Sequence, residues 1–545
     1  MIPSRTCLSS SLRQWRRSFP LCRLPSRFPP LACRGFFSSS SSASSSTTKK
    51  PDFPVFPFKK EDPAVIQTEA PHVPFLFPGD ETPSRNPYAN IPLNVSALEK
   101  DEEGKFASVG HELKYAQLEN GLRIASCDRG GVHSSLGLFV DAGTRLEDPS
   151  NFGVSHMMEL MAFQSSKHLS HLRTVKTVEA VAAHASAMSG KEHLVYSVDC
   201  LRQFMPLMVP LMVGNVASPL FLPEEVEKAA SKVEDVWRKA AMNPEHQVTE
   251  LLHAAAYQNN TLGFPTHCSE QSLEYFNEET MRKFMADYFT PDRMVFVGVN
   301  VNHDELCKWL MRSFAEYKTP PPNPHVQRPR ATYTGGDCRM EAPIEMMHLA
   351  VGWETAGWNS EDLVPATVLQ TILGGGGSFS MGGPGKGMHS RLYTQVLNHQ
   401  SGVESCIAFN SMYADSGLFG LYFQGHAECG ADVTNQLVSQ ARKLGTVTGD
   451  ELRRAKNALK ASIHMNLETK AVLVEDVGRQ LLMSGTWQSP GELTEKIDAV
   501  NEPEIAALVH RIFKKPPSVA AYGHIGGERG VPGYEEIRTK LTARR

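Results

Sequence analysis

The chain has 545 residues, of which 41% are hydrophobic and 21% charged, and its formal net charge at pH 7 is −4. Because a single hydrophobic core rarely grows beyond about 250 to 300 residues, this length predicts more than one domain. The negative charge disfavours a nucleic-acid partner, and the ten dispersed cysteines, without a Cys-x-x-Cys pair, indicate neither a disulfide framework nor a cysteine zinc site.

The first fifty residues have the composition of a targeting segment. They contain seven arginines, two lysines, no acidic residue and a serine-rich end, which is typical of a mitochondrial transit peptide. Arg34 stands two residues before the aromatic Phe36, a pattern similar to presequence cleavage sites, so we expect residues 1–36 to be removed. A basic tail with another use is the alternative. The segment carries +9, so residues 51–545 carry −13 against −4 for the whole chain.

Residues 37–108 differ from the rest of the chain because serine and proline dominate them. From Pro51 onwards, aromatic residues such as Phe53 and Phe75 stand between the prolines. Proline-rich composition predicts an extended arm rather than a domain. Because a spacer needs no aromatic side chains, we expect this arm to lie along a partner subunit.

Residues 109–318 form a first predicted domain. It opens with a hairpin signal around Asn120-Gly121, a dipeptide that favours tight turns between strands. Alternating apolar residues then predict a strand, and a helix that contains His156 follows. The predicted elements are the hairpin at 115–124, a strand at 136–140, the His156 helix, a strand at 294–301 and a helix at 306–314.

The His156 helix carries an incomplete metal-binding motif. In the inverted zinc motif His-x-x-Glu-His, two histidines four residues apart bind one zinc ion from the same helical face, and the glutamate acts on the zinc-bound water. His156 and Glu159 match this pattern, but Leu160 stands where the second histidine belongs. Leucine cannot bind a metal, so we expect this chain to hold none.

The most apolar run of the chain, 204–222, does not predict a membrane-spanning helix. Pro206, Pro210, Asn215 and Pro219 interrupt it, whereas a span needs about 20 predominantly apolar residues. We therefore expect no direct membrane span, and any membrane association would come through a partner.

A proline-rich linker at 319–336 precedes a second predicted domain at 337–545. Strands are expected at 348–353, 418–423 and 518–522, with a helix at 362–373 that has Pro365 in its first turn. Both halves thus place strands before helices, which predicts two similar α+β domains with mixed or antiparallel sheets packed with helices. The helix at 362–373 takes the place that the His156 helix has in the first domain.

Eight glycines fall within fourteen residues directly after this helix. Glycine loses more backbone entropy on folding than any other residue, so the concentration indicates a use for a mobile backbone without side chains. A phosphate-binding Gly-x-x-x-x-Gly-Lys-Ser/Thr loop does not fit, because Ser380 and Gly387 stand at its first and last positions. A disordered linker is the other interpretation. The candidate substrate-binding residues are Gly374, Gly375, Gly376, Gly377, Ser378, Phe379, Ser380, Met381, Gly382, Gly383, Pro384, Gly385, Lys386 and Gly387.

Three segments resemble the pitrilysin-type zinc peptidases, namely 142–163 around the incomplete motif, 183–197, and the glycine-rich loop continued to Tyr393. Within that family the chain is most similar to the alpha subunits of mitochondrial processing peptidases, whose hallmarks are a degenerate zinc motif and such a loop. The resemblance covers about residues 110 to 545. It implies that the two domains form half of a peptidase chamber.

The resemblance also implies that zinc belongs to a partner beta subunit with a complete motif, and that this chain holds no cofactor. A distant glutamate supplies the third zinc ligand in the family, and the corresponding position here is Val236, with Glu234 and Asp235 close by. We expect His156 and Glu159 to be a packed or hydrogen-bonded remnant of the motif.

A non-catalytic subunit is therefore expected, which recognises precursor presequence peptides while the beta subunit cleaves them. Its location would be the mitochondrial matrix or the matrix side of the inner membrane. The loop would contact the extended peptide through backbone groups, with Phe379 and Met381 as apolar contacts. Presequences are basic, so Lys386 is not expected to be the docking charge. Ser390 is expected to cap the helix that follows, and Arg391 to be structural.

Two alternatives stay open at this point. The core subunits of the mitochondrial cytochrome bc1 complex share the fold that the resemblance implies, so the chain could be a structural subunit of respiratory complex III, alone or combined with processing. The glycine-rich loop favours processing, because a purely structural subunit does not need it. An independent zinc peptidase is disfavoured by Leu160.

Overall fold

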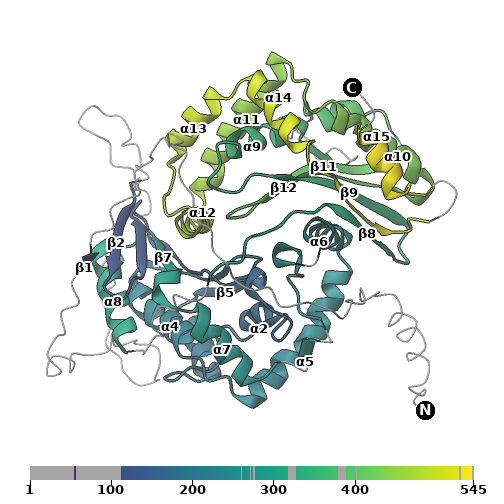
Figure 1. The fold of residues 1–545 in the computed structure, drawn as a ribbon. Coiled ribbons are helices and arrows are strands. Elements are labelled where there is room, and N and C mark those ends of the chain that lie inside the picture. Colours follow the sequence, from purple (N-terminus) through teal and green to yellow (C-terminus); the bar gives the residue numbers. More distant parts are fainter. Residues whose placement is uncertain are drawn as a thin grey trace, which may run out of the picture. The chain divides into compact units, whose positions relative to one another are not determined.

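The computed structural model shows a chain built from two halves, each a sheet packed with helices (Figure 1). We call residues 112–316 the first half and residues 327–542 the second half. The structure describes residues 55–56, 112–258, 260–269, 272–273, 276–316, 327–377, 388–400, 402–526 and 530–542. The predicted transit peptide and almost all of the predicted arm lie outside these residues.

The sheet of the first half is mixed and has the strand order β1-β2-β3-β7-β4-β6-β5, in which β1 is added from outside this half. Its strands are β1 (Val55–Phe56), β2 (Lys114–Leu118), β3 (Arg123–Cys127), β4 (His133–Val140), β5 (His184–Ser189), β6 (Leu194–Leu201) and β7 (Met294–Val299). β3 and β7 run parallel, whereas β7, β4, β6 and β5 pair antiparallel in that order. The short β1 comes from the arm and pairs in parallel with β2.

The second half contains a sheet in the order β10-β11-β12-β9-β13-β8. Its strands are β8 (Gly336–Glu341), β9 (Met346–Thr355), β10 (Gly375–Gly377), β11 (Val403–Met412), β12 (Gly417–His426) and β13 (Ser518–Gly523). β8 and β13 run parallel, and all other neighbours are antiparallel.

The two sheets share one topology. In each sheet an early strand runs parallel to the last strand of that half, namely β3 to β7 and β8 to β13. The last strand then pairs with β4, which precedes α2, or with β9, which precedes α9. β3, β7, β4, β6 and β5 thus correspond to β8, β13, β9, β12 and β11. The prediction of two similar α+β domains is confirmed, and α9 occupies in the second half the place that α2 has in the first.

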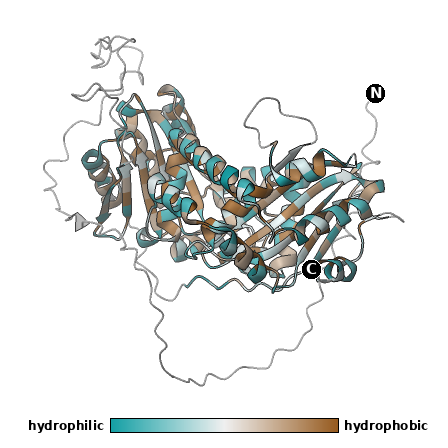
Figure 2. Cartoon of the chain, turned by 90° about the horizontal axis from the view of Figure 1, so that it is seen from above, coloured by the Kyte–Doolittle hydropathy of each residue, from teal (hydrophilic) through white to brown (hydrophobic). Residues whose placement is uncertain are grey.

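The helices cover these sheets. Those of the first half are α2 (Val154–Leu160), α3 (His171–Ala180), α4 (Met205–Ala217), α5 (Pro223–Ala241), α6 (Pro244–Tyr257), α7 (Glu278–Tyr288) and α8 (His303–Glu316). Those of the second half are α9 (Leu363–Leu373), α10 (Gly430–Arg442), α11 (Gly449–Glu468), α12 (Lys470–Met483), α13 (Pro490–Ala499), α14 (Glu502–Ile512) and α15 (Tyr534–Thr542). Most of these helices have one polar and one apolar face (Figure 2).

One helix is apolar almost all round, and it lies in the core of the first half. α4 has nine buried residues although Pro210 is inside it, which fits a helix enclosed by protein on most sides. Among the described residues, no helix combines the length and the apolar character that crossing a bilayer requires.

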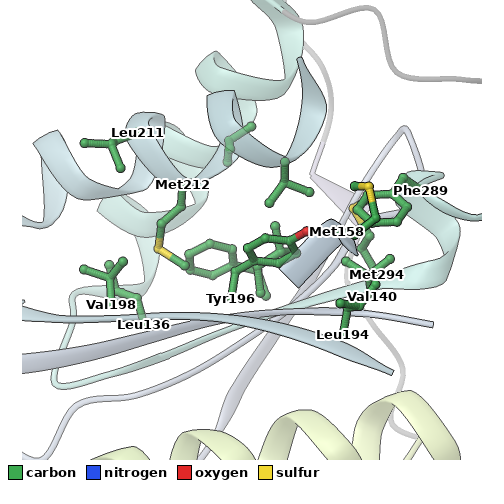
Figure 3. Close-up of a cluster of buried hydrophobic side chains, with 14 of the residues drawn as sticks. Leu136, Val140, Met158, Leu194, Tyr196, Val198, Leu211, Met212, Phe289 and Met294 are labelled. Carbon is green, nitrogen blue, oxygen red and sulfur yellow. The ribbon is translucent and has the colours of Figure 1, made fainter. Parts of the chain in front are cut away.

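The core of the first half lies between its sheet and these helices (Figure 3). Leu136 of β4, Tyr196 of β6, Met158 of α2 and Met212 of α4 belong to this cluster, and all four are almost inaccessible to water. Burying a large apolar side chain completely contributes about 1.5 to 3 kcal/mol, so this cluster fixes the position of α2 on the sheet.

The opposite face of each sheet is covered by a helix from the other half. α12 packs its residues Leu473, Val474 and Val477 against β4 and β7 of the first sheet. α6 packs Leu252 and Tyr257 against β9, β13 and β8 of the second sheet. Each half therefore buries a helix of the other half against its own sheet.

Candidate functional site: the incomplete motif and the root of the glycine-rich loop

α2 holds the incomplete zinc motif, and the backbone before it fixes where the helix starts. Gly153 has a φ of 87°, a conformation that side chains disfavour. The Glu147 carboxylate accepts hydrogen bonds from the backbone N–H groups of Gly153 and Ser155, at 2.7 and 2.9 Å. A buried carboxylate therefore satisfies N–H groups that the first turn of a helix leaves without partners. Burial raises the pKa of Glu147 to about 7.

His156 is buried and already hydrogen-bonded. Its Nδ1 accepts a hydrogen bond from the backbone N–H of Cys268 at 3.3 Å, and only 2% of the residue is exposed. Burial, assisted by the neighbouring His267, lowers the pKa of His156 to about 4. The imidazole is thus neutral and built into the core.

Glu159 and Leu160 do not form a metal site with it. The Glu159 carboxylate accepts hydrogen bonds from the backbone N–H and the hydroxyl of Ser189, at 2.8 and 2.7 Å. Leu160 packs against the hydrophobic core of the first half. Glu159, which stands in the position of the general base, is therefore hydrogen-bonded to the last residue of β5.

The two acidic residues near the expected position of the distant ligand have other partners. Glu234 and Asp235 on α5 are exposed and form ion pairs with Arg238. In the parts of the chain that the structure describes, no group of three histidine, cysteine or acidic side chains is placed to hold a metal ion. These residues do not fit the catalytic zinc that the motif implies in its complete form, which takes three protein ligands.

A buried polar group that sequence patterns did not indicate lies beside His156. The ring of His267 stands 5.1 Å from that of His156 and 4.9 Å from that of His246, centroid to centroid. Lys191 donates to the Glu250 carboxylate at 3.1 Å. Burial favours a raised pKa for Glu250, but Lys191 and the neighbouring histidines outweigh it and lower the pKa to about 2. An internal ion pair is thus part of this region.

The glycine-rich loop begins at the end of α9. Gly374 follows the helix with a φ of 58°, and Gly375–Gly377 form β10, which pairs with Ser405–Ile407 of β11. The other predicted substrate-binding residues, 378–387, lie outside the described residues. The sequence predicted that the loop begins at Gly374, whereas Gly375–Gly377 form a strand of the second sheet.

Two glycines at this root are required by the fold. A Cβ at Gly374 would lie 2.4 Å from the Cβ of Ser390, and one at Gly375 would lie 2.0 Å from the carbonyl oxygen of Cys406. The Ser390 hydroxyl accepts a hydrogen bond from the backbone N–H of Gly375 at 3.2 Å. The expectation that Ser390 caps the next helix is therefore wrong, because its side chain instead ties together the two ends of the loop.

Arg391 holds the chain after the loop in place. Its guanidinium bonds to both oxygens of Glu451 and to the carbonyl oxygens of Lys443 and Thr446, at 2.7 to 3.1 Å. Only 4% of the residue is exposed. With all its donors directed into the protein, Arg391 has a structural role.

An ion cluster around the buried Arg145 and Glu192 joins the two halves and was not foreseen from the sequence. Arg145 donates to Glu192, to both oxygens of Asp415 in the β11–β12 turn, and to the carbonyl oxygen of Pro329. Arg328 adds contacts to Asp141 and Glu192. We call this the Arg145 cluster, consisting of Asp141, Arg145, Glu192, Arg293, Arg328 and Asp415.

Two models of known protein families match this chain. Residues 123–270 match the family model described as insulinase (peptidase family M16), and residues 275–459 match the model described as peptidase M16 inactive domain. The chain belongs to peptidase family M16.

Its relatives within that family are alpha subunits of mitochondrial processing peptidases. The chain is 36% identical to the probable subunit alpha-1 of Arabidopsis thaliana, over 79% of this chain and 85% of the relative. It is 35% identical to subunit alpha of Solanum tuberosum, over 78% and 84%. It is 32% identical to subunit alpha of Homo sapiens, over 84% and 90%.

A solved structure shares the fold. A chain of complex III2 from Candida albicans aligns with a TM-score of 0.67 and 21% sequence identity, over 79% of this chain and all of the other. At this identity the likeness concerns the architecture alone.

Proposed function

We propose that this chain is the non-catalytic, substrate-recognising alpha subunit of a heterodimeric mitochondrial processing peptidase. A beta subunit would supply the zinc, polarise the scissile carbonyl and activate the water. This chain would hold the presequence through backbone groups of the loop 374–387. The proposal places it in the mitochondrial matrix, as the names of its relatives and its basic amino-terminal segment support.

The observation that carries the proposal is the state of the motif on α2. His156 and Glu159 are hydrogen-bonded to the protein itself, and the partly buried Leu160 packs against the hydrophobic core. Residues 275–459, moreover, match the family model described as peptidase M16 inactive domain. A chain whose described residues offer no metal site but which has the glycine-rich loop is suited to binding rather than to hydrolysis.

The test is cleavage of a synthetic presequence peptide by this chain alone, by a catalytic beta subunit alone, and by the two together. The matched variant replaces 378–387 by a short Gly-Ser link and keeps β10, because Gly374 and Gly375 are needed by the sheet. We expect activity only in the mixture, and its loss in the variant. Activity of this chain alone would refute the proposal, and an undiminished mixture with the variant would refute the role of the loop.

A second candidate is a core structural subunit of respiratory complex III, alone or in addition to processing. The observation in its favour is the fold shared with the complex III2 chain from Candida albicans. Migration together with cytochrome b on a native gel of solubilised inner membranes would support it. Migration only with the beta subunit, in a smaller species, would count against it.

We also propose that the arm at 37–108 lies along the partner subunit. Its described part, Val55–Phe56, extends the first sheet by pairing with β2. Removing residues 57–105 should weaken assembly with the beta subunit, as measured by size-exclusion chromatography. Unchanged assembly would contradict the idea.

A further inference from the structure

β10 is a strand that its own residues do little to stabilise. It consists of Gly375–Gly377, and glycine packs no side chain against its neighbours and loses more backbone entropy on folding than any other residue. The φ angles of Gly374, Gly375 and Gly376 are 58°, 118° and 159°, which residues with a side chain rarely adopt. In the described residues β10 pairs with β11 alone. Its ordered form therefore depends on contacts from outside the strand.

One such contact comes from β11. The hydroxyl of Ser405 donates a hydrogen bond to the carbonyl oxygen of Gly376, at 3.2 Å. The carbonyl oxygen of Gly374 accepts from the N–H of Ala408, at 3.0 Å, so the backbone groups of Gly374 and Gly376 face β11. Ser405 thus adds a side-chain hydrogen bond on the edge of β10 that is paired with β11.

A second contact reaches β10 from its other edge. Successive residues of an antiparallel pair direct their backbone groups to opposite sides, so the N–H of Gly375 points away from β11. The hydroxyl of Ser390, on the chain that leaves the loop, accepts a hydrogen bond from this N–H at 3.2 Å. Ser390 and Ser405 therefore hold the glycine strand between them.

The place of Ser390 is fixed by the residue that follows it. Arg391 is almost fully buried. Its guanidinium makes four hydrogen bonds, to Glu451 and to two backbone carbonyl oxygens before α11, at 2.7 to 3.1 Å. Ser390 thus presents its hydroxyl from an anchored position, and its hydrogen bond keeps the two ends of the loop 374–387 together.

A strand held in this way has a paired and an unpaired form, and a ligand that needs the paired form binds in proportion to the population of that form. One hydrogen bond contributes a factor of about five to such an equilibrium. Removing one of two bonds lowers a large paired fraction only slightly, whereas removing both lowers it several-fold. The losses caused by the two serines should therefore be more than multiplicative.

We propose that Ser390 and Ser405 are positioning residues for presequence binding, because their hydroxyls maintain the paired form of β10 from which the loop 374–387 binds the peptide. The inference rests on the proposed function and specifies what prepares the loop for its ligand. An ordered loop root reduces the entropy that is lost when the peptide binds. Neither serine has to touch the peptide for this effect.

The test uses the heterodimer and a fluorescent peptide of residues 23–40, which spans the expected cleavage site. Fluorescence anisotropy with a catalytically inactive beta subunit gives the Kd, and cleavage by the active heterodimer gives kcat and KM. The variants are Ser390→Ala, Ser405→Ala and the two combined. The matched control combines Ser186→Ala with Ser197→Ala, because these two hydroxyls bond to each other at 2.8 Å across β5 and β6.

We expect the Kd to rise about twofold in each single variant and about fivefold or more in the double variant, with KM raised and kcat unchanged. Without peptide, the backbone amides of 374–377 should exchange their hydrogens faster in the double variant. Its thermal unfolding midpoint should equal that of the control, which should bind the peptide like the wild type. Ser405→Thr keeps the hydroxyl and should also bind like the wild type.

An unchanged Kd in the double variant, or an equal loss in the control, would overturn the inference. Losses that simply multiply would also overturn it, because they indicate direct contacts between the hydroxyls and the peptide. Binding that survives the double variant but is lost when 378–387 are replaced would reject the positioning role alone. A wild-type heterodimer that does not bind the peptide would reject the proposed function as well.

Discussion

Replacing Arg145 by methionine should destabilise the chain because it leaves a buried carboxylate without its closest cation. The side chains of Arg145 and Glu192 are 1% and 3% exposed. Breaking a buried pair by removing one partner costs about 3 to 5 kcal/mol. Arg328 still lies 3.7 Å from Glu192, and the backbone N–H of Ala414 still donates to it. Asp415 is partly exposed and can be solvated. We therefore expect a loss near the lower limit, about 3 kcal/mol.

The loss should depend on pH with a defined sign. Burial raises the pKa of Glu192 even though Arg328 and Arg145 lower it. Without Arg145 the pKa in the folded chain rises further above the unfolded value. Between the unfolded and the folded pKa of Glu192, the folded state of the variant then binds more protons than the unfolded state. The stability of the variant therefore falls as pH rises through that interval. The destabilisation should be larger at pH 8 than at pH 5.

Urea unfolding of the purified full chain, followed by tryptophan fluorescence, measures this effect. The matched control is Arg453→Met, because Arg453 and Asp450 form an exposed pair with 73% of each side chain accessible. Such pairs contribute about 0 to 1 kcal/mol, so the control should unfold like the wild type. A loss of less than about 1 kcal/mol for Arg145→Met at pH 8, or a loss that did not shrink at pH 5, would show that Glu192 does not depend on Arg145.

Two further predictions concern the packing between the halves and the response to acid. Gly478→Ala should lower the free energy of unfolding by about 1 to 3 kcal/mol, because the new Cβ would lie 2.1 Å from the buried ring of Phe139. The control is Gly491→Ala, where the nearest atom to the new Cβ is 3.9 Å away. Equal effects of the two substitutions would contradict this prediction. Burial lowers the pKa of His348 to about 4, so its contribution to stability is present above the unfolded pKa of about 6.5 and is lost as pH falls towards 4. The melting temperature of His348→Gln should therefore fall less than that of the wild type between pH 6.5 and 4. The exposed control His510→Asn should behave like the wild type. A parallel decline in wild type and His348→Gln would count against this role of His348.

Several features of the fold follow from local sequence. The hairpin at Asn120-Gly121 is present, with Gly121 at a φ of 95° and the Asn120 side chain accepting from the N–H of Leu122. The substitution at Leu160 likewise removes a ligand without reference to any other element. Such signals could be read because they depend on residues that are close together in the chain.

Other features depend on contacts that no local pattern encodes. Arg145 and Asp415 are 270 residues apart, so no local pattern could pair them. The amphipathic patterns of α6 and α12 indicate apolar faces but not which sheet each face covers. The three glycines of β10 are poor strand formers, and only the pairing with β11 makes them a strand.

Glu159→Gln in this chain, assayed in the assembled heterodimer, tests most directly whether the motif on α2 is inert. The glutamine oxygen can still accept from Ser189, which Glu159 now contacts through its Oε2, so the fold should be preserved. We expect presequence cleavage to stay within twofold of the wild type and the zinc content of the complex to be unchanged. A loss of about a hundredfold or more, the scale expected of a general base, would show that this chain carries catalytic chemistry and would contradict the account.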